Sequence, residues 1–158
     1  MSAFFARFAD FYSGVHACVR GRRRMDPPRC TSQHLLADTP EENDRLLQEI
    51  LDKRRTAIIT PLSAWPEGLP IPAGEEYHVL LDSAGEERCV LRMEPSHLIS
   101  FRDIPASFAL REGRETSLAQ WQQRMRTQLQ QRSIRDGRPF SLDELMVVET
   151  FTMVYNEE

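Results

Sequence analysis

The sequence has little cysteine and no long apolar run. Its 158 residues include three cysteines, Cys18, Cys30 and Cys89. They are too few and too scattered for a disulfide framework, which favours a reducing compartment. No segment reaches the apolar length of a membrane span, and charged residues interrupt the phenylalanines at the start, so this stretch lacks the apolar core of a signal peptide. We therefore expect a cytoplasmic protein without membrane association.

The chain also lacks a strong excess of charge of either sign. Its formal net charge is −4, so the surface as a whole does not attract nucleic acid, and any such site must be a local patch. Hydrophobic residues make up 41% and charged residues 28%, which is ordinary for a globular protein. The length suffices for one domain with its own core and an added terminal element.

Aromatic residues gather at the amino terminus. Phe4, Phe5 and Phe8 lie at helical spacing and predict an amphipathic helix within residues 2–19. Its apolar face either packs on the chain's own domain, which we favour, or recruits a partner. The second possibility keeps a protein-interaction module among the candidate functions.

An arginine-rich segment follows this helix. It contains Arg22, Arg23 and Arg24. The adjoining glycine and paired prolines predict an exposed linker. The arginines are either solvated or form a phosphate-contacting patch for nucleic acid, to which Arg54 would add. We assign residues 1–36 to the helix and linker, and residues 37–158 to the folded domain.

Four residues of metal-ligand type lie near this segment: His16, Cys18, Cys30 and His34. Their spacing does not match a zinc finger. His16 and Cys18, two residues apart on a helix, point in different directions. We expect no metal and no cofactor.

The chain is organised around a glycine corner between two short helices. Pro105 fits the first turn of the first helix, which ends at Gly113. Ser117 and Gln120 then match a capping box that opens the second helix. Glu112 lies at the corner itself, where its carboxylate is either structural or points into a site.

The residues of this corner resemble a family signature. The pattern Phe-x-Asp-Ile-x-x-x-Phe-Ala-x-x-Glu-Gly, followed by Ser-Leu-x-x-Trp, runs from Phe101 to Trp121. It is similar to the signature of the ASCH family (activating-signal-cointegrator homology domains), and the resemblance spans about residues 38–155. ASCH domains are similar to PUA domains, which are small β-barrels associated with RNA. The resemblance implies an α+β fold: a small, mainly antiparallel PUA-like β-barrel flanked by helices, here with an extra amino-terminal helix.

The periodicity of the remaining chain agrees with such a barrel. A threonine cap and an early proline predict a helix from Thr39 to about Asp52. Alternating apolar residues predict a hairpin of Tyr77–Leu81 and Arg88–Met93. Leu145–Tyr155 predicts a long closing strand.

The segment Lys53–Ile58 departs from the family's reactive set. Relatives have Gly-x-Lys-x-x-Thr here, and in those that resemble amidohydrolases acting on N4-acylated cytidines the chemistry is attributed to this lysine, this threonine and a glutamate. In this chain Arg55 occupies the lysine position, Ile58 occupies the threonine position, and Glu112 is retained. Arginine does not deprotonate in proteins, and isoleucine offers no nucleophile. The resemblance therefore does not carry the activity across.

Two hydroxyl groups keep a hydrolase as an alternative. In an extended strand Thr56 and Thr60 share the face of Ile58, so a neighbouring hydroxyl can take over. The enzyme would be a divergent N4-acylcytidine amidohydrolase or a ribonuclease, with Glu112 as the one credible acid or base. Whether the protein is an enzyme stays open.

The same positions can instead form a binding site. Arg55 would hold a phosphate and Glu112 would accept hydrogen bonds from a ligand, or the two side chains would pair and stabilise the corner. Trp65, in a proline-rich loop, would stack on a base or close the barrel end. We predict binding of RNA or a modified, nucleotide-like ligand in a cleft beside Glu112 that Thr56 and Thr60 also line. The sequence leaves the oligomeric state open.

Overall fold

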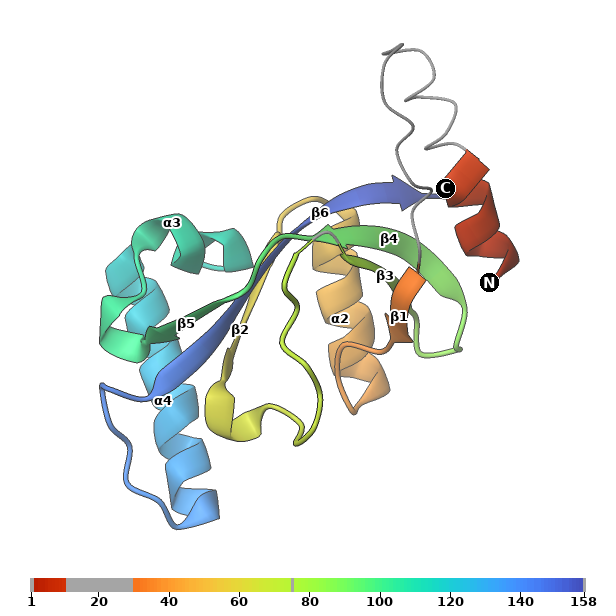
Figure 1. Ribbon diagram of the computed structural model, residues 1–158. Coiled ribbons are helices and arrows are strands. Elements are labelled where there is room, and N and C mark those ends of the chain that lie inside the picture. Colours follow the sequence, from red (N-terminus) through yellow and green to blue (C-terminus); the bar gives the residue numbers. More distant parts are fainter. Residues whose placement is uncertain (1, 11–29, 75, 158) are drawn as a thin grey trace.

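The computed structural model describes residues 2–10, 30–74 and 76–157, with side chains from Ser32 onward in the second of these ranges. The chain forms a curled, mixed sheet that makes a half-barrel, with helices packed against it (Figure 1). This α+β architecture confirms the predicted fold class. Among the described residues, none of the helices has the length and apolarity needed to cross a membrane.

In the described residues, six strands make up the sheet. They are β1 (Cys30–His34), β2 (Ala57–Pro61), β3 (Glu76–Leu81), β4 (Glu87–Met93), β5 (His97–Ser100) and β6 (Leu145–Asn156). Their order is β1-β3-β4-β6-β2, and β5 also pairs with β6. The long strand β6 joins two parts of the sheet, because its first half pairs with β2 and β5 and its second half pairs with β4.

Local sequence signals account for several elements. The Thr39 side chain accepts a hydrogen bond from the amide of Glu42 and begins α2 (Pro40–Leu51). The antiparallel hairpin of β3 and β4 and the closing strand β6 also form as predicted. Apolar side chains of α2 and of the sheet face beneath it form one core cluster: Leu47, Ile50, Leu80, Cys89, Leu91, Met93 and Phe151.

The strand β1 corrects one prediction. Its residues fall in the segment that the sequence assigns to a linker, yet they pair in parallel with β3 at the edge of the sheet. A short polar strand has no alternation of its own to reveal it. Its partner lies more than forty residues away along the chain, so local periodicity does not detect the pairing.

The amino-terminal helix packs on its own domain. Residues 3–10 are helical, and Phe4, Phe5 and Phe8 are at most 5% exposed. Their rings contact Val79 of β3 and Val90 of β4 on the outer face of the sheet. This burial corrects the alternative of a partner-binding module that uses these phenylalanines, because their face is already covered within the chain. The rest of the predicted helix lies outside the described residues.

The opposite end of the sheet carries the glycine corner. Its elements are η2 (Phe101–Asp103), α3 (Ala106–Ala109), η3 (Leu110–Glu112) and α4 (Leu118–Asp136). As predicted, Ser117 caps α4, accepting from the amide of Gln120 at 3.2 Å. Trp121, Met125 and Leu129 of α4 are buried in a second core cluster beneath β2, β5 and β6. This packing holds the corner against β2 (Figure 1).

Candidate functional site

The glycine corner lies directly on the chain that enters β2. Gly113 has a φ of 79°, a left-handed conformation that glycine adopts without strain. A Cβ atom at this position would overlap the carbonyl oxygen of Arg54. The amide of Thr56 also donates to the carbonyl of Arg111 at 2.8 Å. These contacts bring Glu112 beside Arg55.

All acceptor positions of the Glu112 carboxylate are occupied. The residue is 4% exposed. Its Oε2 accepts from the backbone amide of Ile59 at 3.1 Å and from Nη1 of Arg55 at 3.3 Å. Its Oε1 accepts from the indole of Trp121 at 2.8 Å and from Nη2 of Arg124 at 3.0 Å. A carboxylate offers about four lone-pair positions, so Glu112 is satisfied by the protein itself.

This pair of side chains closes the free edge of β2. The strand pairs with β6 along one edge and ends the order of the sheet. On the other edge, Arg55 Nη1 donates to the carbonyl of Ala57 at 3.3 Å, while Glu112 accepts the amide of Ile59. Buried backbone groups require partners. Arg55 and Glu112 therefore replace the strand that is missing there.

Arg55 also contacts α2, through Glu49. The guanidinium is 3% exposed, and its Nε donates to Oε2 of Glu49 at 2.8 Å. Burial alone would raise the pKa of Glu49, but the hydrogen bond from Arg55 and the charges of Arg55, Arg114 and Arg45 lower it. Glu49 of α2 thus stays ionised where it faces the glycine corner.

Arg114 is the least satisfied member of this ion-pair network. Its side chain is 22% exposed, and its closest carboxylate oxygens belong to Glu49 at 3.6 Å and Glu42 at 3.8 Å. Its Nε is buried without a hydrogen-bond partner. Burial and the neighbouring charge of Arg55 lower the pKa of this guanidinium. Arg114 therefore retains an unmet donor beside the Arg55–Glu112 pair.

Neither Arg114 nor Glu115 is among the site residues that the sequence predicts. Glu115 pairs with Arg124, which also bonds Glu112. The available sequence signal for Arg114 is its position directly after the Glu112-Gly113 pair. This position does not predict that the side chain is partly buried, because the residues that cover it come from α2.

The other predicted ligand residues lie apart from this network. Thr56 Oγ1 accepts from Nε of Arg111 at 3.0 Å, and Thr60 lies opposite Val147 on the sheet. The half-buried Trp65 donates its indole N–H to the carbonyl of Leu69 at 2.9 Å, closing its own loop. Ligand contacts by these three residues stay predictions.

The structure describes one residue of the predicted nucleic-acid patch, Arg54. Arg54 is exposed and pairs with Asp52 at 3.1 Å. The remaining members, Arg22, Arg23 and Arg24, lie outside the described residues. The structure therefore neither joins Arg54 to them nor separates it from them.

An acidic residue that the sequence did not single out lies across from Ile58. Glu149 of β6 is its cross-strand partner, so both side chains lie on one face of the sheet. Burial, together with the charge of Glu76, raises the pKa of Glu149 to about 7. By contrast, burial raises the pKa of the Cys89 thiol to about 12, as expected for an unreactive core cysteine.

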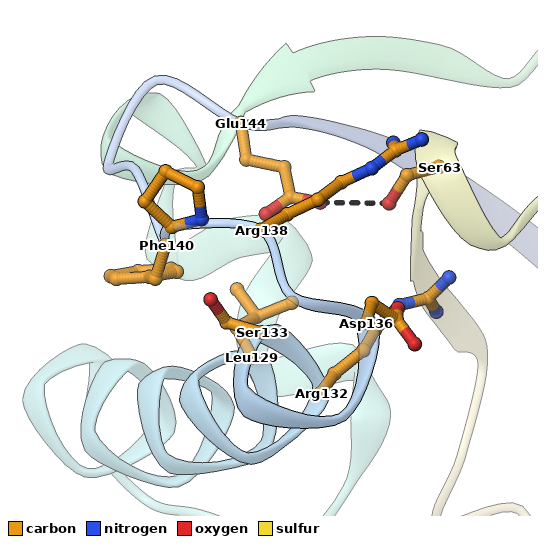
Figure 2. Close-up of a pocket in the computed structure, with 9 residues that line it drawn as sticks. Ser63, Leu129, Arg132, Ser133, Asp136, Arg138, Phe140 and Glu144 are labelled. Carbon is orange, nitrogen blue, oxygen red and sulfur yellow. Dashed lines mark hydrogen bonds and ion pairs between the residues drawn. The ribbon is translucent and has the colours of Figure 1, made fainter.

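A cavity of about 280 Å³ lies at the carboxyl end of α4 (Figure 2). It is lined by Ser63, Leu129, Arg132, Ser133, Asp136, Arg138, Pro139, Phe140 and Glu144. None of the predicted site residues is among them. Arg132 pairs with Asp136 at 3.1 Å. Ser63 donates to Glu144 at 2.9 Å, and the dashed line in Figure 2 marks this contact. Two arginines and two carboxylates line this cavity, so its lining has no net charge.

The comparisons with known proteins agree on the fold. The ASCH domain model matches residues 33–155. A crystal structure of an ASCH domain from Lactobacillus crispatus JV V101 superimposes with a TM-score of 0.65 at 22% identity, covering 79% of this chain and 80% of that one. A crystal structure of a protein from Enterococcus faecalis V583 gives 0.67 at 21% identity, covering 98% and 94%. No curated protein matches the sequence.

Proposed function

Because this chain belongs to the ASCH domain family, we propose that it binds a phosphate-bearing, nucleotide-like ligand, free or as part of RNA, at the arginines beside the Glu112 corner. The observation that carries the proposal is Arg114, whose side chain is 22% exposed and whose Nε makes no hydrogen bond, because its ion-pair partner Glu49 lies 3.6 Å away. Phosphate oxygens accept strong hydrogen bonds from guanidinium groups. The carboxylates of Glu42 and Glu49 lie too far from Arg114 to accept a hydrogen bond, and a bound anion would supply that acceptor.

In this proposal Arg55 and Glu112 position the site and do not contact the ligand. Both side chains are nearly fully buried, and the donors and acceptors they present are met by Glu49, Ala57 and Ile59. They fix the corner from which Arg114 projects. The contacts predicted for Thr56, Thr60 and Trp65 remain part of the proposal, as further ligand contacts.

The contacts of Glu112 favour binding over hydrolysis. A general base must have a lone pair free for the proton that it removes. Glu112 would have to release the amide of Ile59, the indole of Trp121 or an arginine first. For this reason we do not propose a hydrolase role.

The charge distribution favours a small ligand or a short RNA segment. The segment 11–29 contributes five arginines and one aspartate, so the rest of the chain is more acidic than the net charge of −4. A long polyanion gains affinity from many phosphate contacts. Extended RNA binding would therefore depend on Arg22, Arg23 and Arg24, whereas a nucleotide would need Arg114 alone.

The test compares variants at two arginines, Arg114 and Arg132. Binding of nucleoside monophosphates and of a labelled single-stranded RNA is measured by calorimetry and by fluorescence anisotropy. Arg114→Gln should weaken nucleotide binding about tenfold or more, because it removes a charged hydrogen bond. The control Arg132→Gln, which removes an arginine already paired with Asp136, should not. Equal affinities for both variants, or no binding by the unaltered protein, would contradict the proposal.

A cytoplasmic location is also proposed. It follows from the scattered cysteines and the preference of free thiols for reducing compartments. Localisation of the tagged full-length chain by microscopy or fractionation tests it.

A further inference from the structure

A chain of ring nitrogens links β1 to β3 on the inner face of the sheet. His34 Nδ1 lies 3.0 Å from the carbonyl oxygen of Leu35, and His34 Nε2 lies 3.2 Å from Nδ1 of His78. His78 Nε2 lies 3.1 Å from Oε2 of Glu76. The two rings meet edge to face, with centroids 5.3 Å apart. Three contacts therefore involve four ring nitrogens.

The number of hydrogens in this chain is fixed by its two ends. The carbonyl of Leu35 accepts, so His34 Nδ1 must carry a hydrogen. An ionised Glu76 also accepts, so His78 Nε2 must carry one. The contact between His34 Nε2 and His78 Nδ1 needs a third hydrogen. Two neutral imidazoles hold two hydrogens in total, and two imidazolium ions hold four.

We infer that His34, His78 and Glu76 form a proton-dependent clasp that fastens β1 to β3 and is complete when the histidine pair holds one extra proton. With no extra proton, at least one of the three contacts lacks its hydrogen: two bare nitrogens face each other, or a bare nitrogen faces the carboxylate of Glu76 or the carbonyl of Leu35. With two, both facing nitrogens carry hydrogens and repel. The attachment of β1 is therefore strongest at an intermediate pH and weaker on either side of it.

The position of the extra proton follows from burial. His78 is 8% exposed. Burial and the charge of His34 lower the pKa of His78, although Glu76 opposes them. His78 is therefore the ring that stays neutral and donates from Nε2 to Glu76, while its Nδ1 faces Nε2 of His34.

The surroundings of the clasp add one further titratable group. From β6, Glu149 faces Glu76, and its pKa of about 7 means that it gains charge near neutrality. From β4, the cross-strand partners of His78 and Glu76 are Leu91 and Met93. Among the described residues, α2 contributes Leu47 and Ile50 to the apolar cluster beneath this face. Ionised Glu149 lies on the acidic side of the clasp and favours retention of its proton.

The clasp matters because β1 lies at the edge of the sheet. It is a strand of five residues, its one strand partner in the described part of the chain is β3, and its register shifts between Cys30 and Ser32. Short edge strands open locally with low free energies. Loss of one side-chain contact between the strands is therefore large relative to the local stability of β1.

The test is an NMR titration of the full-length protein between pH 5 and pH 9. Nitrogen shifts of the two rings should identify one imidazolium, on His34, and one neutral Nε2–H ring, on His78, and both should respond to the same protonation steps. Amide hydrogen exchange of Ser32 to His34 should be slowest at intermediate pH, and about tenfold faster after correction for intrinsic rates on either side, which is the loss of about one hydrogen bond.

Two variants make the outcome specific. His34→Gln places an uncharged N–H donor near His78 Nδ1, so it should retain β1 protection while flattening its pH dependence. His97→Gln removes a histidine of β5 that stacks on Phe108 at 5.1 Å and should leave the bell shape intact. Two rings that titrate independently, or a His34→Gln protein with an unchanged bell-shaped profile, would overturn the inference.

Discussion

The carboxylate of Glu112 accepts the backbone amide of Ile59 at 3.1 Å, so a side chain from the glycine corner takes the place of a neighbouring strand along β2. The same carboxylate receives Trp121 and Arg124 from α4. One residue thus joins the sheet edge to the helix that covers it. The stability of the corner depends on this carboxylate.

Replacing Glu112 by glutamine should destabilise the fold. An amide turns one acceptor atom into a donor, which then faces either Ile59 and Arg55 or Trp121 and Arg124. Removing one partner of a buried ion pair costs about 3 kcal/mol or more, so the free energy of unfolding in urea should fall by about that amount. Glu67→Gln, at an exposed position, is the control and should change it by about 0.5 kcal/mol or less.

Lys53, two residues before Arg55, has a backbone conformation that favours glycine. Lys53 has a φ of 62° and occupies the position where relatives have glycine. Such a conformation costs a side chain about 1–2 kcal/mol, part of which is offset by the freedom glycine has when unfolded. Lys53→Gly should raise the free energy of unfolding by up to about 1 kcal/mol, whereas Lys53→Ala should not raise it. A loss of stability in the glycine variant would contradict this account.

Gly113→Ala should be among the most damaging small substitutions. Its Cβ would overlap the carbonyl of Arg54, a backbone atom that cannot rotate away. The corner must then separate from β2, which would break the hydrogen bonds of Glu112 as well. Thermal unfolding measures the effect. Gly137→Ala is the matched control, because Gly137 has a similar left-handed φ of 68° but open space around it. Its stability should fall only by the strain of an alanine in this backbone conformation.

Glu149 should make part of the stability depend on pH. Its pKa rises from 4.5 to about 7 on folding, so the folded state binds this proton more tightly than the unfolded state does. The stability it contributes is present below about pH 4.5, declines as the pH rises, and is lost above about pH 7. The difference corresponds to about 3 kcal/mol.

Glu149→Gln should therefore be more stable than the unaltered protein at pH 8, and nearly equal to it at pH 4.5. Denaturation at both pH values measures the difference. The exposed Glu67 offers a control, since Glu67→Gln should change the free energy of unfolding by the same small amount at both pH values. Equal effects of Glu149→Gln at the two pH values would show that burial does not hold the proton on this residue.

Phe5 should contribute to folding within one chain. The ring is fully buried and packs edge to face on Phe8 at 5.2 Å. Replacing a buried phenylalanine with alanine costs about 3–5 kcal/mol, so Phe5→Ala should lower the unfolding midpoint strongly. Ala3→Ser, on the exposed face of the same helix, should not. A Phe5→Ala protein whose stability is unchanged would place this helix on a partner instead.

The sequence by itself determined the elements whose signals are local. Thr39 and Ser117 mark helix starts, and Gly113 marks the corner, because each of these effects acts within one helical turn. The alternation in β4 and β6 and the family signature around Glu112 then set the fold class. The pairing of Arg55 with Glu112 was one of two interpretations that the sequence left open.

Tertiary structure decided what those residues do. Arg55 and Glu112 meet across 57 residues of chain, and their burial depends on α2 and α4 together. The parallel pairing of β1, the raised pKa of Glu149 and the covered face of Phe5 likewise depend on distant segments that no local pattern specifies. Hydrogen bonding and burial are properties of the assembled surroundings, so side chains with the same local signals become a buried ion pair, a sheet edge or a core contact according to what folds over them.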